Sequence, residues 1–241
     1  MPALLAIETS TTACSVALRH FQPDGTWLDS HLQSELPRTH SATLLELIEQ
    51  LLADAGLQRR DLCAVSISNG PGSFTGLRIG LAVAQGIALG LDIPLLPISS
   101  LAVLAASAQQ HSGSAAGQPL LAVTDARMGQ YNVGCFTLAE QGVEPTTLEP
   151  PRLASAADLQ SICERYGAPV VVGELATLAS LAPLASAFCE LQPRADALLA
   201  IAAEHYRQGG WPPRDRVELL YLRGTEAWQK HQPIVPKAPA Q

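Results

Sequence analysis

Two short polar turns carry residues whose types and spacing suit a charged ligand. The first is Glu8-Thr9-Ser10-Thr11, which follows the apolar run 4–7 and offers hydroxyl and backbone N–H groups to a phosphate. The second is Thr124-Asp125, which follows the similar run 120–123. Each turn admits two interpretations: a phosphate-binding loop, or a hairpin whose polar groups bond to one another.

A third turn, Asn69-Gly70-Pro71-Gly72, precedes a helix expected from residue 74 to about residue 90, with Ser73 as its N-cap. A glycine-rich turn at a helix N-terminus can cradle an anion, but it can equally serve to position the helix. The chain has no Lys before Lys230, and its only candidate for an adenosine loop in the second half is Gly-Glu-Leu-Ala at 173–176. We therefore expect residues 8–11 to be a vestigial phosphate turn and the chain to have no cofactor of its own.

The helix expected over 74–90 is apolar on nearly every side, with a narrow polar sector around Arg78 and Gln85. Gly76, Gly80 and Ala84 recur every four residues and form a seam of small side chains, which lets another helix approach closely. A membrane span is the alternative, but Arg78, Gln85 and two nearby prolines interrupt the apolar run. The pattern favours a central helix of a soluble domain whose apolar excess meets a partner.

The helix expected over 41–55 shows the same excess, because its apolar residues cover an arc of about 160°, wider than one core contact requires. We predict that these two helices form a protein interface. Its predicted members are Leu44, Leu45, Ile48, Leu51, Leu52, Phe74, Gly76, Leu77, Gly80, Val83, Ala84 and Ile87. A Gly80→Leu substitution is then expected to abolish pairing and leave the fold intact.

The expected elements follow the order β-β-β-α-β-α-β, and the order β-β-β-α-β then recurs in the second half. The expected strands are 4–7, 14–18, 26–30, 65–68, 93–98, 120–125, 131–138, 143–148, 169–172 and 217–223. The expected helices are 41–55, 74–90, 100–110, 156–166 and 196–208. This pattern predicts one α/β subdomain over 1–100, completed by 194–228, a second over 101–193, and a disordered tail over 229–241.

Composition limits the function classes further. Apolar residues make up 47% of the chain and charged residues 15%, and the net charge of −7 argues against autonomous nucleic-acid binding. Residues 205–241 are weakly basic, with six Arg or Lys against three acids, which leaves a weak RNA contact open. Five dispersed cysteines without a Cys-x-x-Cys pair, and an N-terminus without a basic leader, predict a cytoplasmic protein.

Four stretches resemble the TsaB (YeaZ) family: LLAIETSTTACSVAL, the block beginning SNGPGSFTGLRIG, DARMGQ and YLRG. The resemblance implies an α/β fold of two tandem RNase H/actin-like (ASKHA) subdomains, each a mixed β-sheet with helices. It also implies a non-catalytic subunit of the complex that makes N6-threonylcarbamoyladenosine at position 37 of tRNA. Its implied partners are TsaD, through the two-helix face, and TsaE, with a homodimer when alone, an indirect or weak tRNA contact, and ATP and metal supplied by the partner subunits.

TsaD resembles this chain but holds a metal through a His-x-x-x-His pair, whose positions correspond here to Ser100 and Leu104. Leucine has no donor atom, and the six histidines include no pair at metal-binding spacing, which also argues against a zinc peptidase. The alternative is a stand-alone ATPase or small-molecule kinase of the actin fold. Kinases of that fold hold an acid near the metal at the first turn, and the chain offers only Glu8 and Asp125 for such roles.

Overall fold

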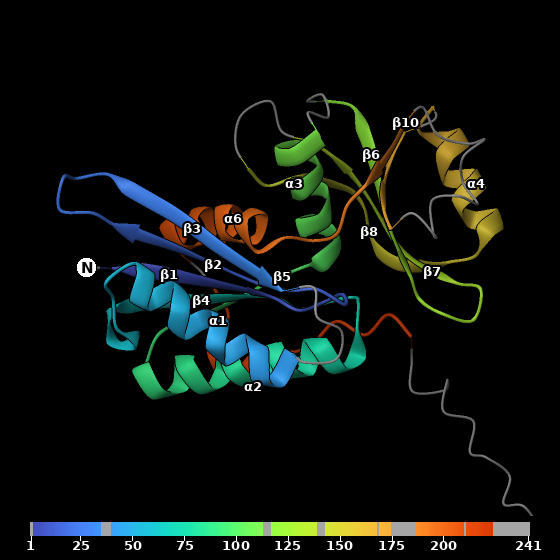
Figure 1. Cartoon of the computed structure of the whole chain (residues 1–241). Helices are drawn as coiled ribbons and strands as arrows, with labels where there is room; N and C mark the ends of the chain where they lie inside the picture. Colours follow the sequence, from blue (N-terminus) through green and yellow to red (C-terminus); the bar gives the residue numbers. More distant parts are fainter. Residues whose placement is uncertain are drawn as a thin grey trace, which may run out of the picture.

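The computed structural model describes residues 2–34, 40–112, 117–138, 143–167, 169–174, 187–209 and 211–223. Two five-stranded mixed sheets lie side by side, and helices cover their faces (Figure 1). The predicted tail over 229–241 lies outside the described residues. The arrangement is the two-subdomain actin-like α/β fold that the sequence predicts.

The first sheet has the order β3-β2-β1-β4-β5. β1 (Ala3–Glu8) pairs antiparallel with β2 (Cys14–Phe21), which pairs antiparallel with β3 (Trp27–Ser34). On its other side β1 pairs in parallel with β4 (Leu62–Ser68), and β4 pairs in parallel with β5 (Leu95–Ile98). β5 is an edge strand, as its internal proline requires.

Helices cover both faces of this sheet. α1 (His40–Asp54) and α2 (Phe74–Leu91) pack on one face and α6 (Ala195–Gln208) on the other (Figure 1). Successive residues of β1 alternate between the two layers, since Leu5 and Ile7 join the core under α1 and α2, whereas Leu4 and Ala6 join the core under α6. Burial on both faces explains why β1 is a continuous apolar run.

The second sheet repeats the topology of the first, with the order β10-β9-β6-β7-β8. β6 (Pro119–Asp125) pairs antiparallel with β7 (Tyr131–Thr137), which pairs with β8 (Thr146–Ala154). β6 also pairs in parallel with β9 (Val170–Gly173), which pairs in parallel with β10 (Ala187–Glu190). α4 (Ala156–Arg165) packs on one face and α3 (Ser100–Ser112) on the other. The order of elements read from the sequence is confirmed for both halves.

Two predicted strands differ from the structure, and one strand of the structure was not predicted. The strand predicted over 143–148 is β8, which begins at Thr146 and continues through two prolines on the sheet edge. β10 was not predicted, because its four residues show no clear alternation. Residues 217–223 form no strand; they run as an irregular segment in which the Leu220 N–H donates to the Asn69 carbonyl, 2.7 Å away.

The small-residue seam of α2 faces the chain's own first turn, which corrects the prediction of a partner helix at this seam. A Cβ atom on Gly76 would lie 2.2 Å from the Thr9 carbonyl oxygen, and one on Gly80 would lie 2.3 Å from the Thr9 hydroxyl oxygen. Ala84 is fully buried in the same core. The seam therefore lets the β1–β2 turn pack directly against the backbone of α2. A leucine side chain at position 80 would occupy the place of this turn, so Gly80→Leu cannot leave the fold intact.

Candidate functional site

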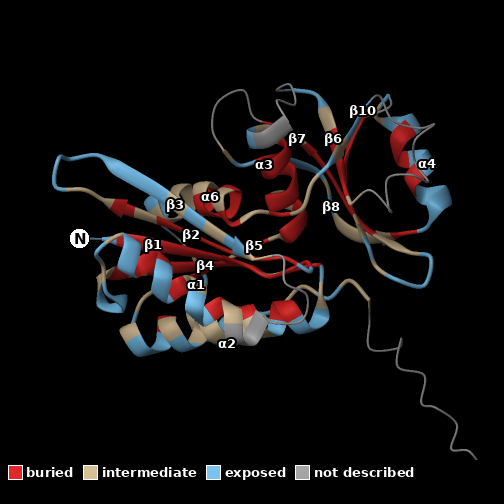
Figure 2. Ribbon diagram, in the orientation of Figure 1, coloured by how far each residue is buried: buried red, intermediate tan, exposed pale blue. Residues whose placement is uncertain are grey.

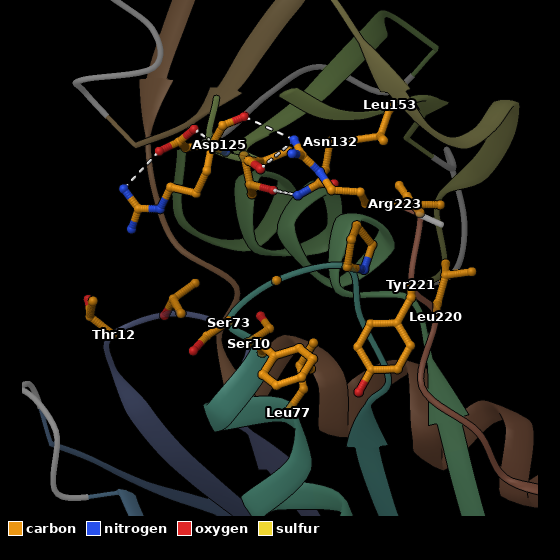
Figure 3. Close-up of a pocket in the computed structure, with 18 of the residues that line it drawn as sticks. Ser10, Thr12, Ser73, Leu77, Asp125, Asn132, Leu153, Leu220, Tyr221 and Arg223 are labelled. Carbon is orange, nitrogen blue, oxygen red and sulfur yellow. Dashed lines mark hydrogen bonds and ion pairs between the residues drawn. The ribbon is translucent and has the colours of Figure 1, made fainter. Parts of the chain in front are cut away.

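The β1–β2 turn and the β6–β7 turn face one another across a cavity of about 840 Å³ between the two sheets (Figure 3). Ser10, Thr11 and Thr12 line it from the first sheet, and Thr124 and Asp125 line it from the second. Other walls come from the turn before α2 and the N-terminal end of that helix, from residues 220–223, and from Asn132, Leu153 and Glu174 of the second half. The two turns singled out in the sequence are thus brought together.

Glu8 does not face this cavity. It is 1% exposed, one carboxylate oxygen accepts a hydrogen bond from the Ser10 N–H at 2.6 Å, and the other is bonded to the Ser68 hydroxyl. Burial raises the pKa of Glu8 above its ordinary value of 4.5, and the hydrogen bonds from Ser10 and Ser68 oppose that shift. Both oxygens are therefore occupied within the fold, so Glu8 ties β1 to β4.

The Asn69-Gly70-Pro71-Gly72 turn supports the first hairpin. The Ser73 N–H donates to the Ser10 carbonyl at 2.6 Å, and a Cβ atom on Gly72 would lie 2.3 Å from that same carbonyl oxygen. Ser73 caps α2, since its hydroxyl accepts from the Gly76 N–H as predicted. One N–H at this helix end is therefore already bonded to the chain, which favours the positioning role over the anion cradle.

Asp125 is engaged within its own turn. One of its carboxylate oxygens accepts from the Arg127 N–H at 2.7 Å, and the other pairs with the Arg127 guanidinium at 3.0 Å. Its neighbour Thr124 accepts a hydrogen bond from the Asn132 amide at 3.2 Å. The turn is thus the self-bonded hairpin that was one of the two interpretations of the sequence.

Sequence reasoning missed the wall formed by the C-terminal segment. Tyr221 accepts a hydrogen bond from Arg78 at 3.0 Å, and the Arg78 guanidinium lies 3.7 Å from the centre of the Phe74 ring. Arg223 reaches across to the β6–β7 turn (Figure 3). The signal available was the Tyr-Leu-Arg-Gly stretch, which served to recognise the family and was given no role.

The positions that correspond to the TsaD metal ligands hold no metal-binding pair. The Ser100 hydroxyl accepts a hydrogen bond from the Gly70 N–H at 3.1 Å, and Leu104 is fully buried beside the second sheet. Within the described ranges, no three His, Cys, Asp or Glu side chains gather closely enough to hold a metal ion. The described part of the cavity therefore offers polar groups for binding.

Most of the predicted interface residues belong to the chain's own core, which corrects that prediction. The residues with no free surface are Leu44, Ile48, Leu51, Leu52, Gly76, Leu77, Gly80 and Ala84. Val83 and Ile87 are partly buried against that core, while Leu45 and Phe74 are about half exposed, at 48% and 50%. A side chain that fills the core cannot also contact a partner, so only these last four keep surface to offer.

The outer side of α2 is nonetheless apolar. Among the described helices it is the one whose length and composition would suit a membrane span, and 28% of its residues are buried in the fold. Its buried side packs on the first sheet, as in a core helix of a globular domain (Figure 2). Leu89 is 70% exposed on the outer side and was not among the predicted interface residues.

Comparison with known proteins gives concordant matches. A family model described as TsaD, tRNA N6-adenosine threonylcarbamoyltransferase, matches residues 34–149. The tRNA threonylcarbamoyladenosine biosynthesis protein TsaB of Escherichia coli K12 is 33% identical over 236 residues, covering 94% of this chain and 97% of that protein.

Two solved structures share the fold over 92% of this chain and 100% of their own. One is YeaZ from Pseudomonas aeruginosa, with a TM-score of 0.75 at 29% identity. The other is described as an uncharacterized protein with similarity to peptidase YEAZ from Pseudomonas aeruginosa, with a TM-score of 0.78 at 31% identity. Similarity along the full length of these relatives shows that the chain belongs to the TsaB family.

Proposed function

We propose that this chain acts in the biosynthesis of N6-threonylcarbamoyladenosine in tRNA as a non-catalytic subunit. The observation that carries the proposal is the match to Escherichia coli TsaB, which extends over nearly the whole of both chains. A partial match would allow a shared domain in an unrelated protein, whereas a full-length match leaves no room for a different catalytic domain within the aligned region.

The hydrogen bonding of two acidic side chains in the turns around the central cavity supports a non-catalytic role. The two carboxylates that a kinase or ATPase of this fold would use, Glu8 and Asp125, are both bonded within the chain. These bonds use part of the acceptor capacity of both carboxylates and fix their orientation within the fold. We infer that ATP and metal are supplied by the partner subunits, TsaD and TsaE.

The outer surface of α1 and α2 is the face that we assign to the partner TsaD. Leu89 is exposed near the C-terminal end of α2, and Leu45 is exposed on α1. Phe74, at the N-terminal end of α2, is half exposed and also lines the cavity and contacts Tyr221. Exposed large apolar side chains on adjacent helices are typical of a protein interface. The same face would support a homodimer in the absence of TsaD, in a cytoplasmic protein whose tRNA contact is indirect or weak.

The proposal is tested by co-expression with TsaD and measurement of the dissociation constant of the pair. Phe74→Asp and Leu89→Asp are each expected to weaken binding by about tenfold or more, because an interfacial charge must be desolvated without a partner. Leu148→Asp is the matched control, since Leu148 is 39% exposed on β8 of the second sheet. Equal affinity for all three variants would contradict the assigned face.

The catalytic role is tested separately on the isolated chain. Calorimetry with Mg-ATP is expected to show no turnover, and full modification activity is expected only after TsaD and TsaE are added. Micromolar ATP binding with hydrolysis by the isolated chain would instead favour the stand-alone ATPase or kinase, and would overturn the non-catalytic assignment.

A further inference from the structure

Residues 217–223, named here the strap, connect the first sheet to the second. The strap begins at Val217, which is 4% exposed in the core beneath α1 and α2. It then passes Asn69, whose carbonyl accepts from the Leu220 N–H at 2.7 Å and whose side-chain amide donates to the Glu218 carbonyl at 3.3 Å. The strap is therefore anchored to the turn that precedes α2.

Gly70 shows how closely the strap is packed at this point. A Cβ atom on Gly70 would lie 2.8 Å from the Leu220 carbonyl oxygen, and the φ angle of +109° is one that side chains other than glycine rarely adopt. Further along, Tyr221 contacts Arg78 and Phe74 on the first turn of α2. The first half of the strap is thus fixed to the first sheet and its helices.

The far end of the strap is fixed to the second sheet by one side chain. The Arg223 guanidinium donates to the carbonyls of Ala126 and Arg127 at 3.0 and 3.1 Å and to the Gln130 side chain at 2.8 Å. It also lies 2.7 Å from the Met128 sulfur. All four contacts belong to the β6–β7 turn, which lines the central cavity on the opposite side from α2.

The β6–β7 turn has a backbone that needs such support. Arg127, Met128 and Gly129 have φ angles of 67°, 56° and 71°, and the first two are non-glycine residues in the left-handed region. Such conformations persist where surrounding contacts determine them. The two carbonyls that accept from Arg223 belong to Ala126, which precedes these residues, and to Arg127, the first of them, so the guanidinium supports the turn in its left-handed form.

The charge of Arg223 has no acid to neutralise it in the part of the chain that the structure describes. Its hydrogen-bond acceptors are two carbonyls and one amide, all of them neutral. Hydrogen bonds from a charged donor are stronger than neutral ones, yet a neutral acceptor holds an Arg less firmly than a carboxylate does. The hydrogen bonds from Arg223 are therefore strong enough to position the β6–β7 turn and weak enough to break and release it.

The two sheets are also joined at a second place. α3 packs on the second sheet and contributes Val103 and Ala106 to the core under α6 of the first sheet. The Ser107 hydroxyl on α3 accepts from the Arg194 N–H at 3.2 Å, at the start of α6. The two sheets are therefore connected at two separate places, by the α3–α6 contact and by the strap, and the walls of the cavity lie between these two connections.

We infer that Arg223 is a releasable latch that closes the central cavity. When its contacts form, the β6–β7 turn is fixed against the strap and α2, and the cavity has its observed width. When they break, the turn loses its left-handed form and the cavity opens on the strap side, while the α3–α6 contact keeps the two sheets together. This device does not depend on the proposed function, because it follows from contacts within the chain.

Limited proteolysis with trypsin tests the latch directly. The Arg127 side chain is 86% exposed, so trypsin can reach it, but the carbonyl of the bond to be cut is the one that Arg223 holds. Arg223→Ala is expected to raise the cleavage rate at the 127–128 bond by about tenfold or more. The reason is that the Arg127 carbonyl loses its hydrogen bond from the charged guanidinium, and the Ala126 carbonyl and the Gln130 side chain lose theirs as well. Cleavage at exposed Arg60 serves as the internal reference within each sample.

Two variants keep the test decisive. Arg223→Lys retains the charge and one nitrogen donor but loses the planar guanidinium and its second nitrogen, which contacts the Met128 sulfur, so its cleavage rate should lie between those of the wild type and Arg223→Ala. Arg216→Ala removes an exposed Arg from the 3₁₀ turn before the strap and should leave the rate unchanged. Circular dichroism and a single cooperative unfolding transition establish that each variant is folded.

Amide hydrogen exchange gives an independent readout at the turn itself. The N–H groups of Ala126 and Gln130 are bonded within the turn, at 3.0 Å to the Gln130 carbonyl and 3.1 Å to the Arg127 carbonyl. Release of the latch should speed their exchange about tenfold while the β6 and β7 amides remain protected. Unchanged cleavage and exchange in a folded Arg223→Ala protein would overturn the latch, and equal acceleration in Arg216→Ala would overturn it by assigning the effect to a general loss of stability.

Discussion

Replacing Gly76 with Ala should destabilise the chain, although the same change at an ordinary helix position stabilises a helix. Alanine is favoured over glycine by about 0.8–1.0 kcal/mol in a helix interior. At Gly76, however, the new Cβ atom would lie 2.2 Å from the Thr9 carbonyl oxygen. Because this neighbour is backbone of the buried β1–β2 turn, it cannot rotate away, and the turn or the helix has to move.

The expected loss follows from these two opposed contributions. Inserting a methyl group into a well-packed site costs about 1–3 kcal/mol or more, and the gain in helix propensity is about 1 kcal/mol. Contact with backbone at 2.2 Å places Gly76→Ala at the upper end of that cost, so we expect a net loss of about 1–2 kcal/mol. The matched control is Gly86→Ala in the same helix, where nothing lies within 4 Å of the added Cβ atom and a gain of about 0.5–1 kcal/mol is expected.

A second substitution, at Thr9, should rescue the corresponding alanine variant at Gly80. Its added Cβ atom would meet the Thr9 hydroxyl oxygen at 2.3 Å, while the next Thr9 atom is 3.5 Å away. Removal of the hydroxyl in Thr9→Ala should therefore turn Gly80→Ala from destabilising to neutral or stabilising, with a coupling energy of about 1–3 kcal/mol. Urea denaturation, followed by circular dichroism, measures all of these free energies of unfolding. If Gly76→Ala and Gly80→Ala stabilise the chain as much as Gly86→Ala does, the seam does not hold the turn and our account of α2 is refuted.

Three further predictions concern the Glu8 carboxylate, the N-cap of α2 and two buried cysteines. Because burial raises the pKa of Glu8 in the folded chain, its contribution to stability is complete below about pH 4.5 and is lost as pH rises through the folded-state pKa. Glu8→Gln keeps the hydrogen-bonding shape without the charge, so its midpoint of urea denaturation should exceed that of the wild type by a margin that grows as the pH rises above 4.5, and a constant margin would contradict this. Ser73→Ala removes the N-cap of α2 and should cost about 1 kcal/mol by the same assay, whereas Ser161→Ala, on the exposed side of α4, should cost less than half of that. Burial raises the pKa of Cys14 to about 11 and that of Cys135 to about 12, so neither should react with iodoacetamide at pH 8 until urea unfolds the chain, and rapid labelling of the native protein would show that they are accessible.

The sequence predicts the fold well where the residue pattern within a segment agrees with the way that segment packs in the folded chain. Strand β1 and helix α2 have unambiguous periodicity and capping, and their predicted positions differ from the structure by one residue or a few. β10 was missed because it has only four residues, and the strap was wrongly predicted as a strand because most of its residues are apolar, although it has no regular hydrogen bonding. Their positions depend on contacts with distant residues, such as Leu220 with Asn69, and no local pattern encodes those contacts.

The candidate site was predictable in part. The repeated strand and turn pattern identifies residues 8–11 and 124–125, and the structure places both turns beside one cavity. The sequence could not determine that Glu8 points away from that cavity, because the direction depends on the pairing of β1 with β4 and on the Ser68 hydroxyl. It also gave no role to Arg223, whose partners lie more than 90 residues earlier.

The interface prediction went wrong for a reason that applies to any helix that is apolar on most sides. Such a pattern indicates that several faces are covered, but it does not identify what covers each face. In α2 the glycine face is covered by Thr9, which lies 67 residues before Gly76 in the chain, and a neighbouring face by the first core. The large apolar side chains of α2 that remain exposed for a partner are Phe74 and Leu89, near the two ends of the helix. The Gly-Pro-Gly-Ser block and the glycines after it are therefore explained by the chain's own packing. If a glycine variant loses partner binding, the direct cause is displacement of the β1–β2 turn and not the loss of a contact between that glycine and the partner.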